Sequence, residues 1–176
     1  MHRFWKQSLT ALLILALIVS FVPSVLPRAA AESEHPTLNW ELKTIDGGTI
    51  NQNTFGDKLV LLVFFQISGC QNSNGTVTSL ASSTLMNNPD LQIVFAEFDG
   101  YDPKYIKQYL DSYGVNYTNQ VVAYDGRTLA FQLSNMIDGD GSVTLSNCAI
   151  IRGNEVLDYW EGNYYVSQIK QHQDLL

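Results

Sequence analysis

The chain has 176 residues, with 10 Lys and Arg against 17 Asp and Glu, and a formal net charge of −7. This acidic balance excludes nucleic acid and anionic lipid surfaces as natural partners, because both carry charge of the same sign. Apolar side chains make up 45% of the residues, which is enough for one ordinary core. We therefore expect a single globular domain.

The N-terminal 31 residues have the pattern of a secretory signal peptide. Basic residues come first, the apolar run "ALLILALIVSFV" follows, and small residues stand at Ala29 and Ala31. An uncleaved membrane anchor is the alternative, because the uncharged stretch 7–27 is long enough to span a bilayer. Residues 1–31 are thus predicted to direct export, and the membrane is a partner only if they are retained.

Export changes the charge of the mature protein. Removal of residues 1–31 leaves 176 − 31 = 145 residues with 10 − 3 = 7 basic and 17 acidic side chains, a net charge of −10. Residues 32–37 would form a short lead and residues 38–176 the domain. The predicted location is secreted or extracytoplasmic, in the cell envelope.

The first half of the domain predicts strands that lead into helices. Two short strands are expected around a turn at residues 46–48, where Asp-Gly-Gly stands. The apolar run "KLVLLVFFQI", residues 58–67, predicts a central strand covered on both faces. A helix is expected from Ser73 to the break at residues 87–89, because apolar side chains recur there at helical spacing.

The next segment predicts a strand, a well-capped helix and a short strand. "LQIVFAEF", residues 91–98, has the apolar composition of a strand. Asp102 and Pro103 then provide an N-cap and a proline at the first helical position, and Gly114 stands where a C-terminal glycine cap belongs. "QVVAY", residues 120–124, predicts the short strand.

The last segment predicts a helix of one or two turns, a hairpin and a final helix. "TLAFQL" gives the first of these, and "NCAII" and "EVLDYW" flank the hairpin turn at residues 152–154. Asn163 is the predicted N-cap of the final helix, which runs towards Leu175. This order indicates an α/β fold with parallel central strands and an antiparallel edge.

Three segments together resemble the TlpA/ResA-type thioredoxin-like proteins of the redoxin superfamily. They are "WELKTIDGGTINQNTFGDKLVLLVFFQISGC", "YLDSYGVNYTNQVVAYDGRTLAFQL" and "CAIIRGNEVLDYWEG". The resemblance implies a thioredoxin-like fold, with a central mixed β-sheet flanked by helices and a C-terminal β-hairpin plus helix. It also implies thiol–disulfide chemistry outside the membrane, with protein thiols or disulfides as partners.

The resemblance assigns candidate site residues and shows where the motif is degenerate. Cys70 stands at the attacking cysteine, Ser73 replaces the resolving cysteine, Gly69 replaces a tryptophan, and Ser146 stands near the family's cis-proline. Cys70 follows an apolar strand and precedes a helix, and backbone N–H groups at a helix N-terminus stabilise a thiolate. A C-x-x-S site can attack a disulfide, but it cannot resolve the mixed disulfide by itself.

Cys148 is the candidate partner of Cys70. The same alignment puts Cys148 two residues beyond Ser146 and therefore on the same face of a strand. In an exported protein two lone cysteines are often paired. A stable structural disulfide, a reversible redox pair and two unpaired thiols all remain open.

Other candidate sites have simpler interpretations. Residues 138–141, Asp-Gly-Asp-Gly, resemble half of a calcium loop, but the required glutamate is absent, so a solvated turn is expected. Glu97 is interpreted as facing solvent at a strand end, with a proton acceptor near the thiol as the alternative. We expect no metal and no cofactor.

Three functions follow. The first is an extracytoplasmic thiol–disulfide oxidoreductase that uses Cys70, with Cys148 as candidate partner. The second is a redox-inactive thioredoxin-like module that binds a protein or peptide at the former active-site face. The third is a secreted domain stapled by a structural Cys70–Cys148 disulfide.

Overall fold

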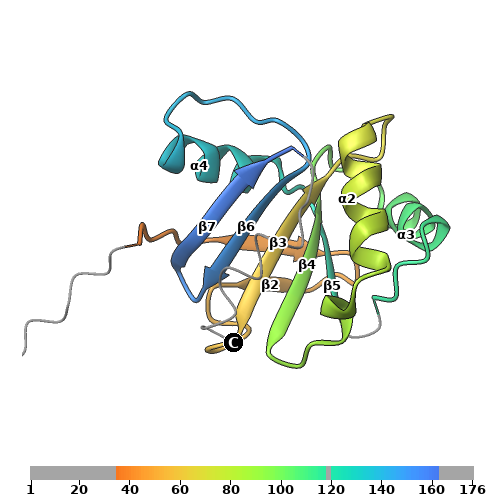
Figure 1. Ribbon diagram of the computed structural model, residues 1–176, viewed down its shortest axis with the longest axis horizontal. Coiled ribbons are helices and arrows are strands. Elements are labelled where there is room, and N and C mark those ends of the chain that lie inside the picture. The colour runs from red at the N-terminus through yellow and green to blue at the C-terminus, as the bar shows by residue number, and fades with distance from the viewer. Residues whose placement is uncertain (1–34, 118–119, 163–176) are drawn as a thin grey trace, which may run out of the picture. The chain divides into compact units, whose positions relative to one another are not determined.

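The computed structural model describes residues 35–117 and 120–162, which form a seven-stranded mixed sheet with helices on both faces (Figure 1). The strands lie in the order β2-β1-β5-β4-β3-β6-β7. Their bounds are β1 (Glu41–Thr44), β2 (Thr49–Asn51), β3 (Leu59–Phe65), β4 (Leu91–Glu97), β5 (Val121–Tyr124), β6 (Asn147–Arg152) and β7 (Glu155–Glu161). This is the α/β architecture that the sequence predicts.

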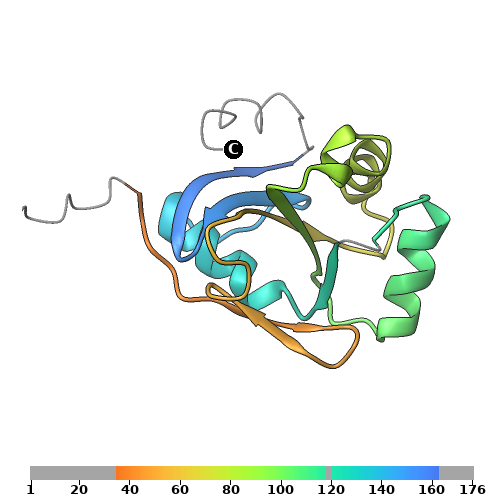
Figure 2. The same ribbon diagram turned by 90° about the horizontal axis from the view of Figure 1, so that it is seen from below.

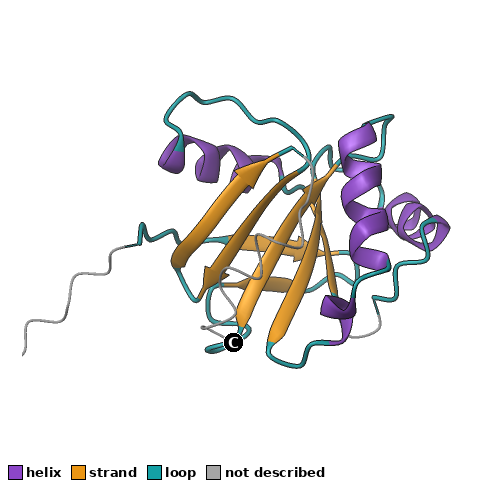
Figure 3. Cartoon of the chain, viewed as in Figure 1, coloured by secondary structure: helices purple, strands orange, loops and turns teal. Residues whose placement is uncertain are grey.

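Within the described residues, three helices cover the sheet, two on one face and one on the other. They are α2 (Gln71–Ala81), α3 (Pro103–Ser112) and α4 (Arg127–Ile137), and a 3-10 turn η1 (Thr84–Asn87) follows α2. The helices α2 and α3 lie together on one face and α4 lies on the opposite face (Figures 2 and 3). Each face therefore has its own hydrophobic core.

The central strand β3 supplies both cores, because its side chains alternate between the two faces. All seven of its residues are buried. Leu59, Leu61, Val63 and Phe65 pack in the core beneath α2 and α3, and Val60, Leu62 and Phe64 pack in the core beneath α4. The prediction of a strand covered on both faces is confirmed.

The pairing of β3 determines where the candidate site lies. β3 runs parallel to β4 and antiparallel to β6, and β4 runs parallel to β5. Because parallel strands end at the same edge, the loops that follow β3 and β4 meet there. The chain passes from β3 into α2 at this edge, which brings Cys70 beside the approach to β6.

The capping signals read from the sequence are confirmed at α3. The side chain of Asp102 accepts a hydrogen bond from the backbone N–H of Lys104 at 2.9 Å, and Pro103 opens the helix. Gly114 follows the helix with φ of +69°, a conformation that costs glycine little.

Two helices differ in length from their predictions. α2 ends at Ala81, and the residues that continued its apolar spacing form η1 instead. Its Ser and Thr residues favour helix only weakly, so packing decides where it ends. α4 has 11 residues rather than one or two turns, because Leu129, Ala130 and Leu133 are buried against the sheet.

Parts of the prediction lie outside the described residues. They are the signal peptide at residues 1–31 and the final helix that begins at Asn163. In the part of the chain that the structure describes, no helix is both long enough and apolar enough to cross a membrane.

Candidate functional site

The site is built around Cys70, which the loop after β3 delivers to the start of α2. Gly69 has φ of +70°, a left-handed conformation that suits glycine, and Cys70 is the N-cap residue of α2. The Cys70 carbonyl accepts the first helical hydrogen bond, from Asn74 N at 3.1 Å. No side chain caps this helix end, and Cys70 is partly exposed. The predicted position of Cys70 at a helix N-terminus is confirmed.

The carbonyl of Leu145 faces the Cys70 thiol. The Cys70 thiol donates a hydrogen bond to the Leu145 carbonyl oxygen, with Sγ 3.9 Å from that oxygen. The Asn72 side-chain amide donates to the same oxygen at 3.0 Å. The peptide between Leu145 and Ser146 is cis, and Ser146 Oγ donates to Phe64 O at 2.8 Å. Ser146 thus occupies the place at which the resemblance expects a cis-proline.

Ser73 lies at the position of a resolving cysteine but holds the loop instead. It is fully buried, and its Oγ accepts a hydrogen bond from Gln66 N at 2.9 Å. A hydroxyl cannot attack a mixed disulfide to form a new S–S bond. Ser73 therefore anchors the end of β3 to α2, and Cys70 is the one thiol of the C-x-x-S segment.

Cys148 lies in β6 on the face that α2 covers, between Val63 and Trp160 of the neighbouring strands. It is fully buried, and burial raises the pKa of its thiol well above the ordinary value, with a smaller opposing effect of a hydrogen bond with Ser146. Both cysteines are free thiols in this structure. As placed, Cys148 is a protonated core residue, and Cys70 is the accessible thiol.

Tyr109 of α3 is a neighbour of the Cys70 thiol. Its hydroxyl donates to Asn74 Oδ1 at 2.6 Å, and its ring stacks on Phe65 with centroids 5.5 Å apart. Burial raises the pKa of Tyr109 far above its ordinary value, and Tyr113 and Cys70 add to the shift. The phenol is therefore neutral beside the thiol at physiological pH.

Glu97 corrects the sequence prediction, because it is fully buried and does not face solvent. Its carboxylate accepts hydrogen bonds from the backbone N–H groups of Asp99, Gly100 and Tyr101 at 2.9, 2.7 and 2.9 Å. These three donors replace the water that the carboxylate loses on burial. Glu97 therefore shapes the loop between β4 and α3.

That loop is tied to the loop that carries Cys70. Gln66 Nε2 donates to Asp99 Oδ2 at 2.6 Å, and Arg127 donates to Asp99 Oδ1 at 2.8 Å. The Arg127 guanidinium also lies 4.8 Å from the centroid of the Phe98 ring. The charge of Arg127 is thus engaged with Asp99 and Phe98.

The Asp-Gly-Asp-Gly segment is a turn, as expected. Asp140 accepts hydrogen bonds from the backbone N–H and the hydroxyl of Ser142, both at 2.8 Å, and these bonds lower the pKa of Asp140. Within residues 35–117 and 120–162, no group of three or more His, Cys, Asp or Glu is arranged to hold a metal ion.

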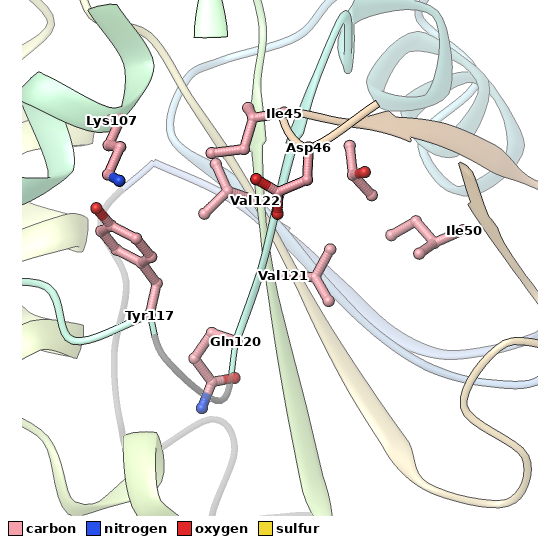
Figure 4. Close-up of a pocket in the computed structure, with 9 residues that line it drawn as sticks. Ile45, Asp46, Ile50, Lys107, Tyr117, Gln120, Val121 and Val122 are labelled. Atoms are coloured by element: carbon pink, nitrogen blue, oxygen red, sulfur yellow. The ribbon is translucent and has the colours of Figure 1, made fainter. Parts of the chain in front are cut away.

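A surface cavity of about 250 Å³ lies elsewhere, between the β1–β2 turn, α3 and β5 (Figure 4). The residues that line it include the apolar Ile45, Ile50 and Val122 and the polar Asp46, Lys107 and Tyr117. None of Cys70, Ser73 and Cys148 lines it. The Cys70 thiol therefore lies outside this cavity.

The described residues have a thioredoxin-like fold, in which Cys70 lies at the start of α2. A thiol:disulfide interchange protein of the thioredoxin family from Chlorobium tepidum is 15% identical, with a TM-score of 0.59, over 80% of this chain and 95% of that one. A secreted Mycobacterium tuberculosis disulfide oxidoreductase homologous to E. coli DsbE is 14% identical, with a TM-score of 0.58, over 78% and 96%.

A thioredoxin-like protein from Aeropyrum pernix is similar to the same degree, with 16% identity and a TM-score of 0.57 over 78% of this chain and 89% of that one. No protein-family model matches the sequence, and no curated protein sequence matches it significantly. The likeness is one of structure, and it confirms the predicted thioredoxin-like fold.

Three residues of the site, Asn72, Asn74 and Tyr109, escaped the sequence analysis. Asn72 and Asn74 flank Ser73 in the first turn of α2, where a polar residue carries no sign of its partner. Tyr109 lies inside the helix predicted between Pro103 and Gly114, and nothing in the sequence marked it as a neighbour of Cys70. Their hydrogen bonds join residues that are 35 to 73 positions apart in the chain, and the spacing of residues within one helix or strand does not predict such contacts.

Proposed function

We propose that the protein is an exported thiol–disulfide exchange protein in which Cys70 is the single nucleophile. The observation that carries the proposal is the partly exposed Cys70 at the uncapped N-terminus of α2, with its sulfur turned to the Leu145 carbonyl. Backbone N–H groups at a helix N-terminus favour the thiolate, which is the reactive form. Protein disulfides are the proposed substrates.

The proposed reaction has two exchange steps. The Cys70 thiolate attacks one sulfur of a disulfide R–S–S–R′, a bond forms between Cys70 and R–S, and R′–S⁻ leaves and takes a proton. Ser73 cannot resolve this intermediate. A second thiol, from a small-molecule thiol or another protein, attacks the R sulfur and releases the Cys70 thiolate. Disulfide and thiol are exchanged without net oxidation of the protein.

A redox-inactive binding module is the second candidate function, and a specific observation favours it. Tyr101 and Tyr105, which follow β4 at the same edge of the sheet, are 36% and 58% exposed. Exposed aromatic side chains are common at sites that bind proteins or peptides. A structural Cys70–Cys148 disulfide is the third candidate, since both cysteines belong to the α2 side of the sheet.

The test is to incubate the exported protein with glutathione disulfide and to map mixed disulfides by mass spectrometry. The proposal expects one adduct, on Cys70. The Cys70→Ser variant should give no adduct, and the Cys148→Ala variant should keep the adduct. With glutathione present, the wild-type protein should then accelerate exchange of a disulfide-bonded peptide, whereas Cys70→Ser should not.

The outcomes separate the three candidates. A Cys70 adduct without any accelerated exchange favours the binding module. Absence of any adduct, together with a bond between Cys70 and Cys148 in the isolated protein, favours the structural disulfide. Either result overturns the proposed exchange function.

A further inference from the structure

We infer that Asn72 is a positioning residue that keeps Cys70 reactive, because it holds the Leu145 carbonyl when the thiol gives up its proton. The inference rests on the proposed role of Cys70 as nucleophile. It concerns a residue between Cys70 and Ser73 whose side chain is turned away from the helix towards the approach to β6.

Two donors share the Leu145 carbonyl oxygen. The Asn72 amide donates at 3.0 Å, and the Cys70 thiol donates at 3.9 Å. A carbonyl oxygen has two lone pairs and can accept both bonds. Only the amide bond remains when Cys70 ionises, because a thiolate has no proton to donate.

Without Asn72, ionisation of Cys70 would leave the Leu145 oxygen without its donors and facing an anion. Leu145 is half-buried, so water replaces the lost donors only in part. Asn72 keeps this oxygen paired in both protonation states of the thiol. The thiolate is then free to accept from the first-turn N–H groups of α2, which no side chain caps.

Among the described residues, charged groups around Cys70 do not provide the same effect. The helix α2 carries no charged residue, and α3 places the neutral hydroxyl of Tyr109 nearby, where it is bound to Asn74. β6 contributes the protonated thiol of Cys148. Across the neighbouring loop, Asp99 is paired with Arg127. Beside the first-turn backbone N–H groups of α2, the Asn72 amide is therefore the polar side chain on which the reactivity of Cys70 depends.

The experiment measures the rate at which iodoacetamide alkylates Cys70 in the full chain as a function of pH, with peptide mapping to separate Cys70 from Cys148. Asn72→Leu removes the donor at similar size. We expect its rate at pH 7 to fall by about tenfold, the effect of one hydrogen bond lost at a partly buried carbonyl. The rate at the alkaline plateau, where the thiol is fully ionised, should stay at the wild-type value.

Two further variants make the test specific. Asn72→Asp should react more slowly than Asn72→Leu at pH 7, because it adds a negative charge, and it should fold, because an acidic residue suits the first turn of a helix. Gln71→Ala, an exposed neighbour in the same turn, should leave the whole profile unchanged.

The inference is overturned if Asn72→Leu matches the wild-type protein at every pH. The inference is also overturned if the alkylation rate of Asn72→Leu falls by the same factor at the alkaline plateau and at pH 7. That pattern would mean that the substitution changes the access of iodoacetamide to Cys70. Alkylation reads the thiol itself and needs no disulfide substrate. If the wild-type protein and Asn72→Leu differ in alkylation as expected, but the wild-type protein forms no glutathione adduct, the proposed function is contradicted and the role of Asn72 is not.

Discussion

Ser73 Oγ accepts a hydrogen bond from the backbone N–H of Gln66 at 2.9 Å, and this bond closes the turn that presents Cys70. Ser73, which stands at the position of a resolving cysteine, is therefore a structural residue. Ser73 is fully buried, so its hydrogen bond with Gln66 stabilises the fold, because a backbone N–H left unpaired in the interior is costly.

Ser73→Ala should destabilise the fold by about 1–3 kcal/mol, because it removes the acceptor of the Gln66 N–H. Chemical denaturation is the measurement. Ser79→Ala, on the exposed side of the same helix, should change the unfolding free energy by less than about 0.5 kcal/mol. Equal effects of the two substitutions would show that the bond to Gln66 does not stabilise the turn.

Ser73→Cys should convert the single-thiol site into a dithiol site. The new thiol would stand three residues after Cys70, in the arrangement that lets one cysteine resolve the mixed disulfide formed by the other. We expect the variant to reduce insulin disulfides several times faster than the wild-type protein when dithiothreitol is the reductant. Asn74→Cys is the control, because the Asn74 side chain contacts Tyr109 and not the loop that carries Cys70. A variant no faster than this control would contradict the prediction.

The buried Cys148 thiol should make the fold sensitive to alkaline pH. Its pKa is raised in the folded protein, so above about pH 8.5 the unfolded chain loses this proton while the folded chain keeps it. Stability is therefore fully present below that pH and should fall by about 1.4 kcal/mol per pH unit above it.

The comparison is urea unfolding between pH 7 and pH 10 for the wild-type protein and Cys148→Val. The variant should lose the slope that one proton contributes between about pH 8.5 and pH 10. Tyr109 and Tyr159, whose pKa values burial also raises, add their slopes only above about pH 10. Parallel curves for the two proteins would mean that Cys148 does not ionise on unfolding in this range.

The sequence predicted the parts of the fold that local patterns encode. The uninterrupted apolar run of β3 predicted burial on both faces, and Asp102, Pro103 and Gly114 marked the two ends of α3. The position of Cys70 at the start of α2 was predicted correctly, because only a short loop separates the buried strand from the helix that follows it. Ser146 was placed by the resemblance.

The features that the sequence missed depend on contacts between distant segments. Glu97 was expected in solvent because a carboxylate in an apolar strand usually needs water, yet three backbone donors of the following loop satisfy it. The contact of Asn72 with Leu145 spans 73 positions. The length of α4 was underestimated, since its stability comes from packing on the sheet and not from its composition.

The export prediction concerns residues 1–31. Mass spectrometry of the protein collected outside the cell should find Glu32 at the N-terminus, because cleavage is expected after the small residues Ala29 and Ala31. Ala29→Lys or Ala31→Lys should block this cleavage, because the site requires small side chains. Recovery of the chain from Met1 to Leu176 in the membrane fraction of the wild-type strain would support an uncleaved anchor instead.

The two cysteines should differ sharply in their reaction with thiol reagents. Cys70 is partly exposed and Cys148 is fully buried, and both are free thiols in the structure. Protein isolated without reductant and trapped in acid should therefore show one thiol that reacts with Ellman's reagent when native and two when unfolded. In Cys70→Ser the native reaction should disappear, whereas in Cys148→Ala it should persist. No reactive thiol in either state would indicate a Cys70–Cys148 bond. The reduction potential would then decide its role, because a structural disulfide has a potential below about −300 mV and a working one lies nearer about −200 mV.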